Sequence, residues 1–193
     1  HNLPLPPAVD AEKKVFSTTG AGNIAYYVDR AQSGRPLVLV HSINAAASAF
    51  EMKPLFEHYR LQRPVFAPDL PGYGFSDRSD RPYTPALFAS VITQFLEQEV
   101  GEAADVIALS LGAEFAAMAA FERPDLMRSL CLISPTGFGE IREIGAETSR
   151  NIRTVVNFPL WGQSLFDLLV TRRSINYFLG KNFAGQPAQE MLD

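Results

Sequence analysis

The sequence contains a single cysteine, which excludes an internal framework of disulfide bonds. This residue, Cys131, lies in an apolar run, and we expect it to be a small, buried hydrophobic residue. Basic residues are also sparse, since no cluster exceeds a pair such as Arg172–Arg173 and the net charge is −4. Binding to a phosphate backbone requires concentrated lysine and arginine, so nucleic acid is not expected as a partner.

Long apolar runs are absent as well, and none is long enough to cross a membrane. The first seven residues lack the charged and apolar regions of a signal peptide. We therefore expect a cytoplasmic protein without a membrane partner. Hydrophobic residues make up 47% of the 193 residues, which is enough for one globular domain with a sizeable core.

Strands and helices are predicted to alternate between residues 36 and 135. Four short apolar runs are typical of strands buried in a parallel sheet, and they cover residues 37–40, 64–69, 105–109 and 129–133. Helical patterns follow three of them, at residues 48–59, 84–100 and 111–122. Two further strands, at 14–18 and 24–30, are spaced for a hairpin. The alternation predicts an α/β fold with a mostly parallel sheet flanked by helices.

The first of these helices carries two boundary signals. Ser48 and Glu51 fit a capping box, which places the start of the helix at residue 48. Pro54 is expected to kink or restart it. After residue 137 the pattern is helical and shows no buried-strand run. We therefore divide the chain into a core at residues 1–137 and a helical excursion at residues 138–193.

Ser110 stands where the apolar run at 105–109 meets the alanine-rich helix. A serine at such a junction is carried on a tight turn that requires small residues two positions before and after it. Ala108 and Gly112 meet this requirement, as in a nucleophile elbow. The N–H of Leu111 and the start of the helix would then face a developing oxyanion. The alternative is an ordinary serine that caps a helix N-terminus.

Three other stretches extend the likeness to a known superfamily. The loop 69–76, of sequence DLPGYGFS, resembles the D-x-P-G-x-G-x-S loop of the α/β-hydrolase superfamily. The run LVLVH at 37–41 resembles the strand before its oxyanion loop, and SPTG at 134–137 lies where its cap leaves the sheet. The resemblance implies an α/β-hydrolase fold in which residues 1–137 form the N-terminal part of the core. Residues 138–193 would then be the start of a helical cap, and the last strands of the sheet would be absent from this chain.

The resemblance also assigns roles to individual residues. Ser110 would be the nucleophile, and the N–H groups of Leu111 and Ile43 would form the oxyanion hole. The superfamily has a His-Gly pair before the second donor, whereas this chain has His41–Ser42. Ser42 either lends its hydroxyl to the site or packs against and caps the loop, and we favour the second role. His41 is expected to shape the loop rather than act as base.

The superfamily's triad runs nucleophile, acid, histidine along the chain, but no histidine follows Ser110. His1 lies in a tail and His58 is expected to face solvent, so neither is a credible base. Strand 129–133 would also be an apolar sheet edge. We therefore expect these residues to be part of a longer hydrolase. Its remaining strands, the acid and the histidine would come from a second chain or segment.

The expected function is that of an esterase-like serine hydrolase that acts on a small-molecule acyl substrate and uses no metal or cofactor. A serine at the elbow argues against dehalogenases and epoxide hydrolases, which attack through a carboxylate. His41, Ser42, Phe158 and Trp161 are candidate pocket residues. The aromatic side chains either contact an apolar substrate or only attach the cap to the core.

Two other functions remain open. One is a cofactor-free lyase, acyltransferase or perhydrolase on the same fold. The other is a hydrolase-like protein without catalytic activity that binds a ligand or a partner. The His-Ser pair and the lack of a histidine after Ser110 are the observations that favour this second alternative.

Overall fold

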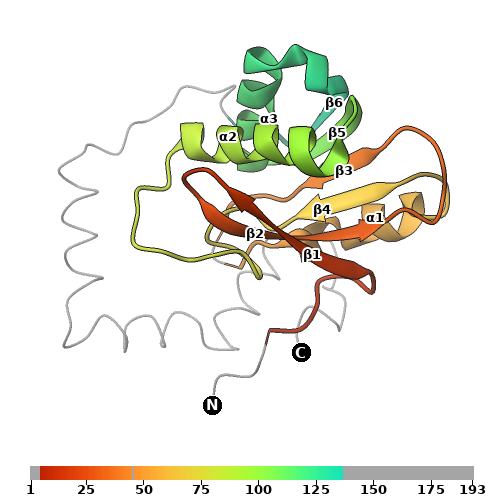
Figure 1. The fold of residues 1–193 in the computed structure, drawn as a ribbon, viewed down its shortest axis with the longest axis horizontal. Coiled ribbons are helices and arrows are strands. Elements are labelled where there is room, and N and C mark those ends of the chain that lie inside the picture. The colour runs from red at the N-terminus through yellow and green to blue at the C-terminus, as the bar shows by residue number, and fades with distance from the viewer. Residues whose placement is uncertain (1–4, 45, 137–193) are drawn as a thin grey trace. The chain divides into compact units, whose positions relative to one another are not determined.

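A computed structural model of the protein describes residues 5–44 and 46–136 (Figure 1). The chain divides into two compact units, His1–Glu140 and Ile141–Asp193. The second unit lies outside the described residues. The predicted cap at 138–193, the boundary at residue 137 and the candidate residues Phe158 and Trp161 therefore stay predictions.

The predicted N-terminal hairpin is confirmed. Strand β1 (Glu12–Thr18) pairs antiparallel with strand β2 (Gly22–Asp29). The connection contains Gly20 and Gly22, both with positive φ, which is the conformation that glycine allows in a tight turn. Strand β2 then pairs antiparallel with the next part of the sheet, so the hairpin joins the sheet through one strand only.

The remaining strands form the parallel part of a six-stranded sheet with the order β1-β2-β4-β3-β5-β6. Their bounds are Leu37–Val40 for β3, Val65–Pro68 for β4, Ala104–Leu109 for β5 and Met127–Ile133 for β6. Strand β3 lies between β4 and β5 and is parallel to both. Because Val40 pairs with Ala108, the carboxyl ends of β3 and β5 lie side by side. This register brings the loop that begins at residue 41 next to the turn at residues 109 and 110.

The helices begin and end near the predicted residues. The α-helices are α1 (Lys53–Tyr59), α2 (Pro85–Phe95) and α3 (Leu111–Glu122). A short 3-10 helix, η1 (Ala49–Met52), precedes α1, a π-helical turn, η2 (Leu96–Val100), extends α2, and a short 3-10 turn, η3 (Pro124–Leu126), follows α3. Thr84 caps α2 by accepting a hydrogen bond from the N–H of Leu87, and Gly101 ends η2 with φ 77°. Pro54 in the first turn of α1 marks the predicted restart.

The sheet separates two hydrophobic layers, because successive side chains on a strand face opposite sides. Val38 and Val40 face α2 and α3, together with Phe66 of β4. Leu37 and Leu39 face η1 and α1, where Met52 and Phe56 are fully buried. Figure 1 shows α2 and α3 on one side of the sheet and α1 on the other. The predicted α/β architecture with a mostly parallel sheet is therefore confirmed.

The prediction that Cys131 is buried is wrong. Cys131 lies on β6, which pairs only with β5 and is an edge strand of the described sheet. Its side chain is exposed, whereas β3 and β4 are buried along their whole length. The apolar sequence of β6 resembled that of a central strand, and an edge position leaves such a side chain uncovered.

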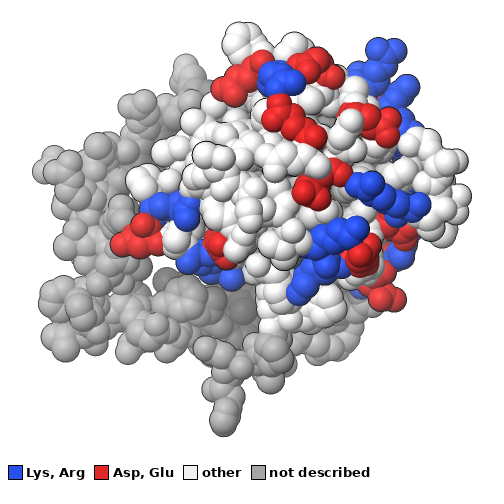
Figure 2. All heavy atoms as spheres, in the orientation of Figure 1, with Lys and Arg blue, Asp and Glu red and all other residues white. Residues whose placement is uncertain are grey.

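Figure 2 shows how charged side chains are distributed on one face of the described structure. On the face that Figure 2 shows, acidic and basic residues lie interspersed, without an extended patch of one sign. In the described ranges, no helix combines the length and apolar character needed to cross a membrane.

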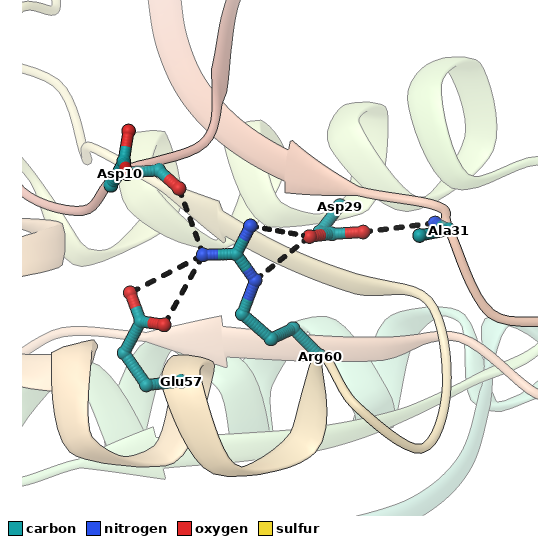
Figure 3. Close-up of polar contacts among 5 residues, drawn as sticks. All are labelled: Asp10, Asp29, Ala31, Glu57 and Arg60. Atoms are coloured by element: carbon teal, nitrogen blue, oxygen red, sulfur yellow. Dashed lines mark hydrogen bonds and ion pairs between the residues drawn. The ribbon is translucent and has the colours of Figure 1, made fainter.

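Arg60, at the end of α1, connects three separate segments (Figure 3). Its guanidinium donates to the Asp29 carboxylate at the end of β2, with Nη2–Oδ2 2.6 Å and Nε–Oδ2 2.8 Å. It also donates to the carbonyl oxygen of Asp10 and to Glu57. The Ala31 N–H, and then Arg60, hold the pKa of Asp29 below its usual value although burial opposes this shift. These contacts link the N-terminal segment, the hairpin and α1.

We expect Arg60→Met to lower the free energy of unfolding by about 2 kcal/mol at pH 7, since it leaves a largely buried carboxylate with one partner fewer. Because the folded pKa of Asp29 is depressed, its contribution is present above the unfolded pKa of about 3.9 and is lost as pH falls through the folded pKa. The difference between wild type and variant should therefore shrink between pH 5 and about pH 3. Urea denaturation across this range measures it. Glu57→Gln, at the more exposed partner, serves as control with an expected loss below about 0.5 kcal/mol, and an equal effect of both variants would contradict the assignment.

Candidate active site

Ser110 lies between β5 and α3 in a backbone conformation that serine rarely adopts, with φ 53° and ψ −124°. Among the described residues other than glycine, only Ser110 and Ser134 have positive φ. The Ser110 N–H donates to the carbonyl of Ile133 (2.9 Å), and its own carbonyl accepts from Ala113 (3.0 Å). The ends of β6 and α3 therefore hold the turn in place. Such a conformation costs about 1–3 kcal/mol and is typical of residues that present a side chain at a functional site.

The structure does not favour the alternative of a helix-capping serine. Ser110 occupies the N-cap position of α3, but its side chain makes no capping hydrogen bond. A capping serine adopts an extended backbone and accepts a bond from the second or third residue of the helix. Ser48 and Thr84 behave in this way in the same structure. The Ser110 hydroxyl is therefore not used to cap its helix.

The predicted need for small residues around Ser110 has a direct physical basis. A Cβ at position 112 would lie 2.2 Å from the carbonyl oxygen of His41, which is closer than any real contact. Ala108 is fully buried beneath the turn. Gly112 thus allows the start of α3 to lie against the loop that follows β3. This contact brings the two predicted oxyanion donors, Leu111 and Ile43, onto neighbouring segments.

A cavity of about 600 Å³ opens beside these two segments. Ile43 and Leu111 both line it, together with apolar and aromatic side chains that include Phe88 and Phe115. The rings of Phe88 and Phe115 are stacked, with centroids 4.6 Å apart. Ser110 is partly exposed and immediately precedes Leu111, but it is not itself part of the lining.

Other lining residues escaped the sequence-based prediction. They are spread along the loop after β4, α2 and α3, namely Pro71, Gly72, Tyr73, Arg78, Tyr83, Pro85 and Glu114, with Asn44 from the loop after β3. Glu114 lies one turn after Ser110 and accepts a hydrogen bond from the hydroxyl of Thr136. Only the spacing of Glu114, four residues after Ser110 on a helix, could have indicated its position from sequence.

His41 and Ser42 were expected in the pocket, but neither lines the cavity, because both are buried, with 0% and 5% of their surface exposed. The Nε2 atom of His41 accepts from the Leu70 N–H (2.8 Å), which leaves the proton on Nδ1 for the carbonyl of Ser42 (2.6 Å). Burial lowers the pKa of His41 and favours this neutral form. The side chain thus shapes the loop, and neither ring nitrogen is available to act as a base.

Ser42 follows the second of its two predicted roles, since its hydroxyl binds within the loop. It donates to Glu51 Oε1 (2.8 Å) and accepts from the amide of Asn44 (2.8 Å). The φ of Ser42 is not positive, so the loop does not require the glycine that the superfamily has there. The predicted capping box is wrong in one respect: Ser48 caps η1, but the Glu51 carboxylate binds Ser42 and Asn44. The reason is that the loop folds back over the start of η1.

Two aspartates hold the loop after β4 through hydrogen bonds from backbone N–H groups. Asp69 is fully buried and accepts hydrogen bonds from the N–H groups of Ala49 (2.8 Å) and Phe75 (2.9 Å). Asp77 accepts from the N–H of Asn23 (2.7 Å). Gly74, with φ 49°, lies against the Asp69 carboxylate, where a Cβ would come within 2.1 Å. The loop is therefore fixed to η1 and to the hairpin.

Among the described residues, no histidine is placed so that it could activate Ser110. His41 is committed to the loop, and His58 is exposed on α1, where it bonds to Gln62 (3.1 Å). In the part of the chain that the structure describes, no three histidine, cysteine, aspartate or glutamate side chains gather to hold a metal ion. The expectation that the protein needs no cofactor stays a prediction.

A sequence profile of the alpha/beta hydrolase family matches residues 37–192. One curated relative, the dihydrolipoyllysine-residue acetyltransferase component of the acetoin cleaving system of Cupriavidus necator, is 33% identical over 114 residues. This alignment covers 55% of the chain and 29% of that protein.

Solved structures show the same fold at low sequence identity. A probable hydrolytic enzyme from Pseudomonas aeruginosa superposes with a TM-score of 0.72 at 19% identity, over 95% of this chain and 58% of that one. An alpha/beta hydrolase fold protein from Burkholderia ambifaria gives 0.68 at 21%, over 100% and 64%. A variant of the haloalkane dehalogenase DatA from Agrobacterium tumefaciens gives 0.66 at 20%, over 93% and 61%. The chain thus spans less than two thirds of each of these proteins.

Proposed function

The chain belongs to the alpha/beta hydrolase family, and we propose that it is a serine hydrolase that cleaves esters or related acyl compounds through an acyl-enzyme at Ser110. The observation that carries the proposal is the conformation of Ser110. Ser110 lies between β5 and α3 with φ 53°, and its hydroxyl makes no hydrogen bond that caps α3. The next residue, Leu111, lines the cavity. A serine cannot open a carbon–halogen bond in the way a carboxylate does, so dehalogenation is not proposed.

In the proposed reaction the Ser110 oxygen attacks the acyl carbon and gives its proton to a base. The N–H groups of Leu111 and Ile43 would bind the resulting oxyanion. The first N–H groups of a helix have no partner within it, so the Leu111 N–H is suited to this role. The C–O bond to the alcohol then breaks and the alcohol takes the proton. Water attacks the acyl-enzyme in the same way, which releases the acid and restores the serine.

The base and its acid are proposed to come from sequence outside residues 1–193. Support comes from the described histidines, since His41 is used by the loop and His58 lies on α1. Strand β6 is one edge of the described sheet, next to the parallel strands, and offers a pairing position for further strands, from a second chain or segment. The cytoplasm remains the proposed compartment.

The cavity supports a substrate with an apolar or ring-bearing acyl group. Its lining includes Ile43, Leu111, Phe88 and Phe115, with two tyrosines from the loop after β4 and the segment before α2. Burial of such groups contributes about 25 cal/mol per Å² of apolar surface. The charged residues Arg78 and Glu114 provide sites for a polar substituent.

Labelling with a fluorophosphonate tests the proposal. We expect the full-length protein to form one covalent adduct, located on the peptide that contains Ser110 by mass spectrometry. Ser110→Ala should form none, and Ser134→Ala, at the other strained serine, should label as wild type. If the folded wild-type protein does not react, a ligand-binding protein without catalytic activity is the better explanation.

Acyl transfer is the second candidate, because the curated relative is named as an acetyltransferase component. An acyl-enzyme at Ser110 can pass its acyl group to an alcohol or thiol instead of water. With an activated ester and a thiol present together, product analysis distinguishes the two outcomes. A thioester as main product would favour transfer, and the free acid would favour hydrolysis.

A further inference from the structure

Glu51, on the short helix η1, binds the chain on both sides of Ile43. Its Oε2 accepts from the Ser42 N–H (2.8 Å), and its Oε1 accepts from the Ser42 hydroxyl (2.8 Å) and the Asn44 amide (2.6 Å). Ile43 itself lines the cavity. We infer that Glu51 is a positioning residue, which holds the Ile43 N–H in the orientation that binds the oxyanion. This inference rests on the proposed serine mechanism.

The peptide group between Ser42 and Ile43 is the element that Glu51 controls. Its carbonyl accepts from His41 Nδ1 at 2.6 Å. In a trans peptide the C=O and N–H groups point in opposite directions, so the Ile43 N–H points away from the His41 ring. The Ile43 N–H takes part in no hydrogen bond between described residues. It is therefore an oriented donor without a partner in the described structure.

His41 alone fixes only one side of this peptide. Rotation about the bonds of Ser42 would turn the N–H of Ile43, and Ser42 has no constraint from a glycine-specific conformation. Glu51 removes this freedom, because it binds both the backbone N–H and the side chain of Ser42. Asn44, on the other side of Ile43, donates a hydrogen bond from its side-chain amide to the same carboxylate. Its side-chain oxygen accepts a hydrogen bond from the Ala46 N–H (2.9 Å). The loop is thus held at residues 41, 42, 44 and 46.

Only a carboxylate suits this position, since three donors converge on it. A glutamine offers one oxygen and adds an N–H₂ group that faces other donors. The chain carries serine where the superfamily motif has glycine, and the Ser42 hydroxyl is one of the three donors. Glu51 and Ser42 therefore form a pair in which the side chain at 42 strengthens the loop.

The experiment compares Glu51→Gln with wild type in the full-length protein, using p-nitrophenyl butyrate and its thiono analogue. We expect kcat for the ester to fall about 10–100-fold with KM changed less than about 3-fold, because a displaced donor weakens the transition state and not substrate binding. The ester-to-thionoester rate ratio should fall with it, since sulfur is a weak hydrogen-bond acceptor and gains little from the donor. Glu102→Gln, at an exposed position after α2, is the matched control and should equal wild type.

Two further measurements distinguish a local effect on the oxyanion donor from a loss of folded protein. The rate ratio compares two substrates on the same folded molecules, so a smaller folded fraction does not change it. Adding Ser42→Gly to Glu51→Gln removes one donor and should restore part of kcat, as expected for residues that act through each other. If wild type reacts at Ser110 and Glu51→Gln keeps the wild-type ratio, the role of Glu51 is overturned. If wild type does not react at Ser110, the proposed function fails, and this inference fails with it.

Discussion

Replacing Ser110 with glycine is expected to abolish the proposed hydrolase activity and, at the same time, to make the protein more stable. The loss follows from the removal of the proposed nucleophile, and for serine enzymes it amounts to at least about 10⁴-fold in kcat. The gain follows from the backbone. Ser110 is held at φ 53° and ψ −124°, which glycine adopts without a steric penalty. Relief of about 1–3 kcal/mol of strain exceeds the 0.4–1 kcal/mol (roughly) that glycine costs through the unfolded chain.

We therefore expect the free energy of unfolding to rise by about 1 kcal/mol in Ser110→Gly, as measured by chemical denaturation. The matched control is Ser110→Ala, which loses the hydroxyl but keeps the Cβ. It should lose activity to the same extent and stay within about 0.5 kcal/mol of wild type. Equal stability of the glycine and alanine variants would show that the backbone at Ser110 is not strained. The comparison of the two variants therefore separates the free energy that the strained backbone costs from the contribution of the hydroxyl to activity.

The sequence was most informative where a structural requirement falls on neighbouring residues. The elbow demands small side chains two positions either side of Ser110, and both Ala108 and Gly112 could be read directly. The structure adds the reason at Gly112, which is the approach of the His41 carbonyl. The strands were predictable for a similar reason, since β3 and β4 are buried along their whole length. The roles of Ser110, Leu111 and Ile43 in catalysis stay predictions.

Features that depend on contacts distant in sequence could not be predicted. The pattern of Ser48 and Glu51 indicated a capping box, but the folded loop offers Glu51 three other donors. Cys131 has the sequence surroundings of a buried strand, but β6 is an edge of the described sheet, as the missing strands also led us to expect, and its side chain is exposed. His41 and Ser42 were near the site in sequence, yet the sheet and η1 bury them. For Glu51, His41 and Ser42 the competing partner comes from another segment, whereas Cys131 is exposed because of the position of its strand in the sheet.

Asp69 shows how far the site depends on buried polar groups beneath it. Its carboxylate accepts from Ala49, at the start of η1, and from Phe75, in the loop after β4. Its carbonyl accepts from the Ser76 hydroxyl (2.6 Å), and that hydroxyl accepts from the Ala25 N–H (2.9 Å). The loop that follows supplies Tyr73 to the cavity, and Tyr73 packs edge-on against His41 with centroids 5.6 Å apart. Asp69 thus connects η1, the hairpin and the cavity wall.

We expect Asp69→Ala to lower the free energy of unfolding by about 3–4 kcal/mol. Two N–H groups lose their acceptor, that of Ala49 in a buried position and that of Phe75 in a partly buried one, and an unsatisfied buried donor costs about 1–3 kcal/mol. Asp69→Asn should be nearly as damaging although it has the same shape, because its N–H₂ group would face one of the two donors. Asp77→Asn, at an exposed aspartate that accepts from one backbone N–H, is the control and should cost about 1 kcal/mol or less. Thermal and urea denaturation of the three variants measure the order of their free energies of unfolding. If Asp69→Asn equals wild type, the carboxylate does not hold η1 and the loop together, and the rigidity of the cavity wall must have another source.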